Sequence, residues 1–308
     1  MRNPFYYSRN YLDGELRVLR RTVVSIVRVD DVPSSVERAV ELAGGLGVEE
    51  GDVVVIKPNA KNPSPPGYGV VTDPRVVEAI VGLAFRNGAG RVKIAEGAAY
   101  PTGAYDSIAA FEAIGIREIA KRWDVELVDL NSYDSVDIDV PDGLVLDWVR
   151  VGRSVLEADV VINVPVLKTH RGTLTSVCLK NMGVGCATRE EKKRLHRLGI
   201  DEGLVDVYSV VKPKFNLVDG IVALEGDGPN LPPGKAKPLG LLIAGRDGLA
   251  VDAVCAKIMG LDPGKVKHLR LAHQQGLGAL DLGEIEVKGV ALEEVITEFE
   301  LPSTFKNL

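Results

Sequence analysis

Residues 52–95 read DVVVIKPNAKNPSPPGYGVVTDPRVVEAIVGLAFRNGAGRVKIA. The run 52–58 is almost continuously apolar, which predicts a strand buried on both faces. After a loop rich in proline and glycine, Asp73 and Pro74 provide an N-cap and a first helical residue. Apolar residues then recur at helical spacing, and a second strand is expected over 92–95. A strand, a helix and a strand in this order indicate an α/β fold.

The same alternation continues along the chain. Further strands are expected over 125–130, 160–164, 215–222 and 239–244. Two short strands within 136–151 predict a hairpin. The segment 247–259 is apolar nearly all round, so this helix should pack deep in the protein. We therefore predict one α/β domain over residues 1–308, with three layers, a mostly parallel twisted sheet, helices on both faces and a small β-hairpin addition.

The composition argues against several classes of protein. A net charge of −6 over 308 residues does not fit a nucleic-acid partner. Three cysteines without paired spacing fit a reducing cytosol. No stretch approaches the roughly 18 apolar residues of a membrane span, and residues 1–21 lack the apolar core of a signal peptide. We expect a cytoplasmic protein without a membrane partner.

Reactive side chains are concentrated in residues 167–196, directly after the expected strand at 160–164. Open α/β sheets bind their ligands just past the carboxyl ends of their strands. Lys168 and His170 are two residues apart, so in an extended segment both point to one side. Such a pair suits an anionic ligand, a carboxylate or a phosphate, with His170 as an acid/base group. Two surface residues in a loop are the alternative.

Lys180 and Asn181 precede two glycines, Gly183 and Gly185. Glycines allow backbone amides to approach a ligand closely, behind donors such as Lys180 and Asn181. The Gly-Lys-Ser/Thr ending of a P-loop is absent, so a plain loop remains the alternative.

A short helix is expected after residue 188, because Thr188 and Glu191 have capping-box spacing. Lys192 and His196 are four apart on this helix and share a face. Most such pairs are solvated surface, but these two follow Cys186 closely. We therefore include both among the candidate ligand-binding residues.

Several carboxylates require an explanation. Glu225 and Asp227 follow a strand and could act as a base, bind a cation with His170, or form a tight turn. Asp219 and Asp252 lie among apolar residues and need partners, and a structural salt bridge is expected for Asp252. Asp247 is predicted to be the N-cap of its helix.

The three cysteines, at 178, 186 and 255, show no Cys-x-x-Cys pair. Cys178 and Cys255 fit small buried hydrophobic residues. Cys186 is the candidate for a reactive thiol or, with Asp227, for a metal ligand. A divalent metal is compatible with these residues, whereas an iron–sulfur cluster is not expected, and the cofactor stays undetermined.

Taken together, these residues resemble the domain of unknown function 362 family over about residues 52–280. The matching pieces, in the family's order, are Lys57-Pro58-Asn59, Thr72 to Pro74, Asp159 to His170, Lys180-Asn181 to Cys186 with Lys192 and His196, Asp219-Gly220, Glu225 to Pro229, and Asp247 to Asp252 with Gly260. The resemblance adds Lys57 and Asn59 to the candidate site. Many members carry ferredoxin-like cysteine runs, which implies redox or radical chemistry for them, but this chain has no such run.

Three hypotheses remain open at this stage. The first is an enzyme for a small anionic metabolite, in which Lys168, His170 and Glu225 carry acid/base or metal-assisted chemistry. The second is a metallocentre or redox protein, with Cys178, Cys186 and a histidine binding iron or nickel. The third is a non-catalytic binding or assembly factor. A homo-oligomer is compatible with each of them.

Overall fold

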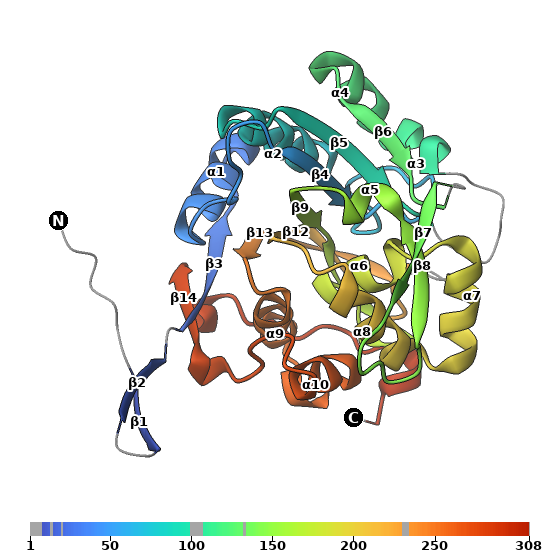
Figure 1. Ribbon diagram of the computed structural model, residues 1–308. Helices are drawn as coiled ribbons and strands as arrows, with labels where there is room; N and C mark the ends of the chain where they lie inside the picture. The colour runs from blue at the N-terminus through green and yellow to red at the C-terminus, as the bar shows by residue number, and fades with distance from the viewer. Residues whose placement is uncertain are drawn as a thin grey trace.

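The computed structural model describes residues 8–12, 15–19, 21–98, 107–131, 134–229 and 234–307. Within this part of the chain, ten strands form the central sheet (Figure 1). Eight of them follow one another in the order β14 (Ile285–Gly289), β3 (Thr22–Arg28), β13 (Lys235–Gly245), β12 (Phe215–Glu225), β9 (Val160–Val164), β4 (Val53–Pro58), β5 (Arg91–Glu96) and β6 (Glu126–Asp129). The other two are β10 (Val166–His170) and β11 (Leu174–Thr175), and β10 pairs with both β11 and β12.

The sheet is mostly parallel, as predicted. Strands β12, β9, β4, β5 and β6 all pair in parallel, and β10 runs parallel to β12. The long strand β13 is antiparallel to both of its neighbours, β12 and β3. The strands β3 and β14, which pair in parallel with each other, were not among the expected strands.

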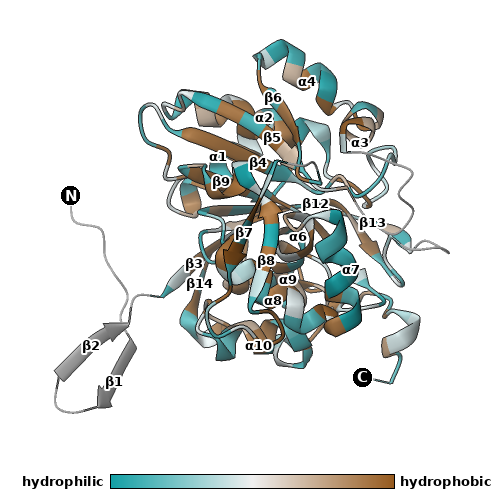
Figure 2. Ribbon diagram, turned by 45° about the vertical axis from the view of Figure 1, so that its right-hand side comes forward, coloured by the Kyte–Doolittle hydropathy of each residue, from teal (hydrophilic) through white to brown (hydrophobic). Residues whose placement is uncertain are grey.

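Helices cover both faces of the sheet, so the predicted three-layer α/β fold is confirmed. On strand β4, Val54 and Ile56 pack with helices of one face and Val55 with helices of the other. Buried residues of the first face come from α1 (Val32–Leu42), α2 (Pro74–Arg86), α3 (Ser107–Ala113) and α4 (Ile116–Trp123). Buried residues of the second face come from α6 (Cys178–Gly185), α8 (Ile200–Val210), α9 (Gly248–Ile258) and α10 (Lys267–Gln274). Figure 2 shows the apolar strands between these layers.

The predicted hairpin is also present. It consists of β7 (Ser135–Asp139) and β8 (Trp148–Gly152), which pair antiparallel outside the central sheet. A second antiparallel pair, β1 (Ser8–Leu12) with β2 (Glu15–Leu19), precedes the main fold. The remaining short elements are α5 (Arg153–Leu156), α7 (Arg189–Leu198), and the 3₁₀ turns η1 (Pro263–Lys265), η2 (Leu282–Glu284), η3 (Leu292–Glu294) and η4 (Ser303–Phe305).

Local signals explain where the helices next to the site begin. Asp73 caps α2 by accepting from the Arg75 amide at 2.9 Å, ahead of Pro74. Thr188 is the N-cap of α7, but its hydroxyl makes no capping bond, so the expected capping box does not form. No helix in the described ranges has the length and apolar character needed to cross a membrane.

Candidate functional site

A cavity of about 300 Å³ lies where β4, β5 and β9 end, with α6 and α7 on its other side. Parallel strands end at the same edge of a sheet, which brings residues distant in sequence together. The cavity is lined, among the described residues, by Asn59, Lys61, Glu96, Gly97, Lys168, His170, Ser176, Lys180, Asn181, Val184, Gly185, Lys192, His196, Ile200 and Pro229. Most of the predicted ligand-binding residues are in this set.

A buried ion pair lies beside the cavity, where Glu96 is a lining residue and Lys57, although predicted to bind the ligand, is not. Lys57, on β4, donates to Glu96 Oε1 at 2.8 Å, and the two side chains are 0% and 3% exposed. The Glu96 carboxylate also accepts from the backbone amides of Ala60 and Gly97, each at 2.8 Å. Glu96 therefore balances the charge of Lys57, and its charge also raises the pKa of Lys168 and Lys192, against the larger effect of burial.

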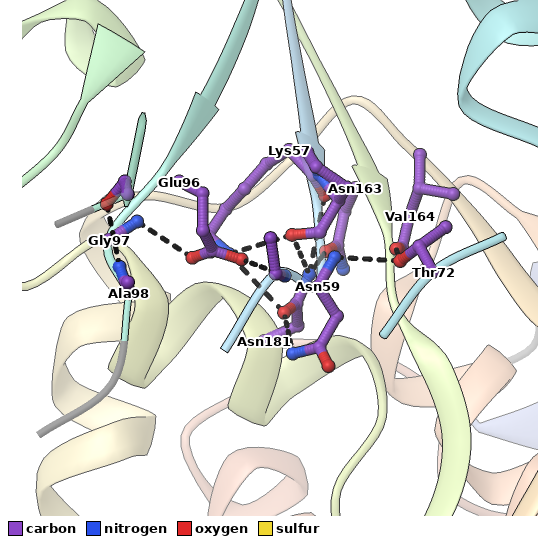
Figure 3. A network of polar contacts seen from close by, with 12 residues as sticks. Lys57, Asn59, Thr72, Glu96, Gly97, Ala98, Asn163, Val164 and Asn181 are labelled. Atoms are coloured by element: carbon purple, nitrogen blue, oxygen red, sulfur yellow. Dashed lines mark hydrogen bonds and ion pairs between the residues drawn. The ribbon is translucent and has the colours of Figure 1, made fainter. Parts of the chain in front are cut away.

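Asparagine side chains connect this ion pair to the neighbouring strands (Figure 3). Asn181 Oδ1 accepts from Lys57 at 3.3 Å and from Asn59 Nδ2 at 2.9 Å. Asn181 Nδ2 donates to Asn163 Oδ1 at 2.8 Å, and Asn163 in turn donates to Asn216 at 2.9 Å. The amides therefore hold α6 against β4, β9 and β12, and a fully bonded buried network of this kind makes a rigid floor.

Lys168, on β10, reaches the cavity with its amine already engaged. Its Nζ donates to Asn59 Oδ1 at 2.5 Å and to the Val70 carbonyl at 2.9 Å. Burial lowers the pKa of Lys168 to about 7, and the nearby Lys61 and Lys57 add to this shift. Lys168 is thus a group that gains or loses a proton near neutral pH.

His170 ends β10 and has one ring nitrogen fixed by the backbone. Its Nδ1 accepts from the Gly172 amide at 3.0 Å, so in the neutral ring the proton is on Nε2. Burial lowers the pKa of His170 well below 6.5, and Lys180 and Lys61 act in the same direction. The ring is therefore neutral and able to donate from Nε2 to a ligand.

Lys61 and Lys180 complete the group of amines. Lys61 donates to the Pro229 carbonyl at 3.1 Å, and burial lowers its pKa. Lys180 lies on α6, and burial, followed by the charges of Lys61 and Lys168, lowers its pKa well below 10.5. The described part of the chain gives the Lys180 amine no hydrogen-bond or ion-pair partner.

Lys192 and His196 both line the cavity from α7, as expected of residues on one helix face. Lys192 Nζ donates to the Gly97 carbonyl at 2.7 Å and to Asn131 Oδ1 at 2.8 Å, and burial lowers its pKa to about 8. Burial also lowers the pKa of His196, with Lys180 and Lys61 contributing. Lys192 thus ties α7 to the loop after β5.

The expected glycine loop is wrong. Gly183 and Gly185 lie within α6 and have helical backbone angles, so their amides are not presented as a loop would present them. A Cβ at Gly183 would collide with the Leu204 carbonyl oxygen, and one at Gly185 with Lys57 Nζ. These glycines are needed for close packing: Gly183 for contact with α8, and Gly185 for space around the buried ion pair.

Glu225 and Asp227 do not join His170 at the cavity. Glu225 ion-pairs with Lys237 of the adjacent strand β13 at 2.8 Å and accepts from the Glu300 amide at 3.0 Å. Asp227 accepts from the backbone amide and hydroxyl of Ser303 at 2.7 and 2.8 Å. Both carboxylates therefore hold the C-terminal segment against the end of β12, and neither lines the cavity.

Cys186 does not fit a reactive thiol or a metal ligand. It is fully buried in the apolar core at the end of α6, and burial raises the pKa of its thiol to about 12. A thiol that stays protonated is a poor nucleophile and a poor ligand. Over the ranges that the structure describes, no group of three or more His, Cys, Asp or Glu residues is placed to hold a metal ion.

The three aspartates have structural partners, but not all are the expected ones. Asp247 caps α9 through the Leu249 amide at 2.9 Å, as predicted. Asp219 accepts from the amides of Asp73 and Ile221 at 2.8 and 3.0 Å. The salt bridge expected for Asp252 is wrong.

Asp252 instead caps a different helix from the one on which it lies. Its carboxylate, on α9, accepts from the Cys178 and Leu179 amides at 2.7 and 3.0 Å. Those amides open α6, whose own N-cap, Val177, makes no side-chain capping bond. The free amides of a helix N-terminus attract a carboxylate, so backbone donors satisfy Asp252 in place of a lysine.

Replacing Asp252 with alanine is expected to lower the free energy of unfolding by about 2 kcal/mol, since two buried amides lose their acceptor. Because α6 carries Lys180 and Asn181, anion affinity at the cavity should fall as well. Urea unfolding and calorimetric titration measure the two effects. The matched control is Asp262→Ala, which removes an exposed cap at the Gly264 amide and should change stability less and affinity not at all.

Sequence reasoning missed several residues of the cavity. Glu96 directly follows the strand expected over 92–95, at the same edge of the sheet as Lys57, and this position could have identified it. Lys61 lies in the proline-rich loop after β4, where no periodic pattern marks it. Val184, Ile200 and Pro229 supply apolar or backbone surface and carried no recognisable signal.

The family model described as domain of unknown function (DUF362) matches residues 54–257. The chain belongs to the DUF362 family. A thylakoid-associated protein of Synechocystis sp. is 30% identical to this DUF362 member over 300 residues, covering 89% of each chain. These matches confirm the resemblance inferred from the residue pattern.

Two solved structures match this DUF362 protein at low TM-scores. The lactate racemase apoprotein of Thermoanaerobacterium thermosaccharolyticum matches with a TM-score of 0.48 and 14% identity, over 84% of this chain and 58% of that one. A protein of Thermotoga maritima matches with a TM-score of 0.42 and 12% identity, over 79% of this chain and 59% of that one. The chain thus spans under two thirds of both structures, and likenesses this distant carry no argument about its activity.

Proposed function

We propose that this DUF362 protein is an enzyme that acts on a small anionic metabolite, a carboxylate or a phosphate, in the cavity beside α6. One observation carries the proposal: among the described residues that line the cavity, four are lysines and two are histidines, against one carboxylate, Glu96, which is paired with Lys57. Such a surplus of buried donors is the counterpart of a bound anion.

The electrostatics of the amines support the same conclusion. Lys61 and Lys168 lower the pKa of Lys180, and Lys61 and Lys57 lower that of Lys168, so the amines oppose one another's protonation. An anion bound among the amines would raise their pKa, so the amines would take up protons when the anion binds. Binding is therefore expected to be coupled to proton uptake.

We assign roles from the contacts of each group. Lys61 and Lys168 would hold the anion, and Lys180 would contact the ligand beside them, because Lys180 has no other partner in the described structure. Asn59 and Asn181 would act indirectly, since their amides position Lys168 and Lys57. His170 would donate a hydrogen bond from Nε2–H to the ligand, and Lys168, with its pKa of about 7, would be the acid/base group.

We also propose a location and partners. We place the protein in the cytoplasm, because its three cysteines lack paired spacing, with a small acid as its ligand and without a membrane partner. The net charge of −6 argues against a nucleic-acid partner. The acid/base form of the reaction is preferred to a metal-assisted one, because Glu225, Asp227 and Cys186 have structural roles away from the cavity surface.

Sulfate and oxalate should bind with an affinity that falls as pH rises through about 7 and above. In the ligand-free protein Lys168 has a pKa of about 7, and a bound anion raises it, so binding above that pH requires proton uptake. For each proton taken up on binding, the affinity falls by up to about tenfold for each unit by which the pH rises. Calorimetry in two buffers of different ionisation enthalpy counts the protons, and neither anion itself titrates in this range.

Lys180→Gln should weaken this binding at least about tenfold, and the exposed control Lys121→Gln should leave it unchanged. A screen of small carboxylic and phosphorylated acids for turnover, with His170→Ala as the inactive reference, tests the enzymatic part. Anion binding that is absent, or that is unchanged in Lys180→Gln, contradicts the proposal.

A further inference from the structure

Lys180 differs from the other lysines of the cavity in its bonding. Lys61 donates to Pro229, Lys168 to Asn59 and Val70, and Lys192 to Gly97 and Asn131. Lys180 donates to no group in the described ranges, although its side chain lines the cavity from α6. The Lys180 amine can therefore contact a ligand in the cavity without first losing a hydrogen bond to the described part of the protein.

The surroundings of Lys180 favour an uncharged amine. Burial is the main cause that lowers its pKa well below 10.5, and the charges of Lys61 and Lys168 are the next two. An unprotonated amine has a lone pair, and a lysine kept unprotonated by burial and by neighbouring cations is a nucleophile toward carbonyl carbon.

The groups around Lys180 suit a carbonyl compound that also carries a carboxylate. Lys61 and Lys168 supply positive charge on one side of the cavity. Val184 and Ile200 supply an apolar lining, and a cavity of about 300 Å³ accommodates a small molecule only. A short 2-oxo acid combines a carboxylate, an adjacent carbonyl and an apolar tail in this size.

We propose that Lys180 is a nucleophile that forms an imine with a short-chain 2-oxo acid whose carboxylate is held by Lys61 and Lys168. The inference rests on the proposed function of the same cavity and names its substrate class. Lys180 Nζ bonds to the carbonyl carbon, and the carbon–oxygen bond then breaks. The two amine protons leave with that oxygen as water, and no electron is gained or lost.

The dehydration step needs an acid at the departing oxygen. Lys168, whose pKa is about 7, can give its proton to that oxygen, which leaves as water, and can then take the remaining proton from the nitrogen. The neutral His170 ring donates a hydrogen bond from Nε2–H to the same oxygen, because Nδ1 is bonded to the Gly172 amide. The cavity thus contains a nucleophile, an acid and an anion-binding pair.

Borohydride trapping of the full-length protein tests the proposal. Pyruvate or 2-oxobutyrate is added, sodium borohydride reduces any imine to a stable secondary amine, and mass spectrometry of the intact and digested protein locates it. We expect one adduct per chain at Lys180. Lys180→Arg keeps the positive charge but cannot form the adduct, and its thermal unfolding reports whether it folds.

Propionate separates this inference from the proposed function, because it carries the carboxylate without the carbonyl. Propionate should bind, as seen by calorimetry, and give no adduct. If propionate and pyruvate bind but pyruvate is not trapped, or is trapped equally in Lys180→Arg, the imine is wrong and the anion site stands. If neither acid binds, the proposed function fails as well.

Discussion

Glu96→Gln is expected to destabilise the protein by about 3–5 kcal/mol, because it leaves Lys57 buried without its counter-charge. Glutamine keeps only one acceptor oxygen, whereas the Ala60 and Gly97 amides bond to different oxygens of Glu96, so one of these amides also loses its acceptor.

Two comparisons make this result specific. The double variant Lys57→Met with Glu96→Gln removes both charges and should recover much of the loss, since a buried pair replaced by neutral groups is often tolerated. Glu118→Gln, in an exposed pair with Lys121, should have no measurable effect. Urea unfolding at several pH values measures all three. A Glu96→Gln protein as stable as the wild type would show that the pair is not needed for folding.

Gly183→Ala should destabilise the protein by about 3 kcal/mol or more, although alanine is the better helix former by about 1 kcal/mol. The added Cβ would meet the backbone carbonyl of Leu204 on α8, which cannot rotate away. The two helices must therefore separate, and Asn181, on the same helix, would move with α6. Thermal and urea unfolding measure the stability, and calorimetry measures the loss of anion affinity.

Gly82→Ala is the matched control for this helix effect. Gly82 lies in α2, and its added Cβ would meet the ring of Trp123, a partly exposed side chain that can shift. Alanine should therefore be neutral or slightly stabilising there. If Gly183→Ala also stabilised the protein, the close packing of α6 on α8 would not explain this glycine.

Most strands of the sheet and most lining residues of the cavity could be predicted from the sequence, and the reason is the same for both. Strands such as β4 and β9 are continuous apolar runs, and the polar residues that follow them reach the same edge because the strands are parallel. Lys168, His170 and Lys180 lie at the cavity on this account. The strand β3 was missed because a short apolar run has no period that distinguishes it from other apolar segments, and β14 because its alternation extends over only five residues.

The predictions that were wrong concern residues whose contacts lie far away in the sequence. Glu225 was predicted to be a catalytic carboxylate, but in the folded protein it pairs with Lys237 of β13. The sequence alone does not distinguish a glycine needed for the backbone geometry of a loop from one needed for close packing. Gly183 and Gly185 were therefore predicted wrongly. Asp252 required a helix 74 residues earlier in the chain as its partner, and no local pattern specifies such a contact.

The cap that Asp252 provides also affects how helix α6 forms. Helix α6 has eight residues, two of them glycines, so it has little tendency to form alone. The first turn of α6 has its capping carboxylate only when α9 has docked, so the placement of Lys180 depends on that contact. A ligand bound there should therefore slow hydrogen exchange across α6 and α9 together, as one cooperative unit.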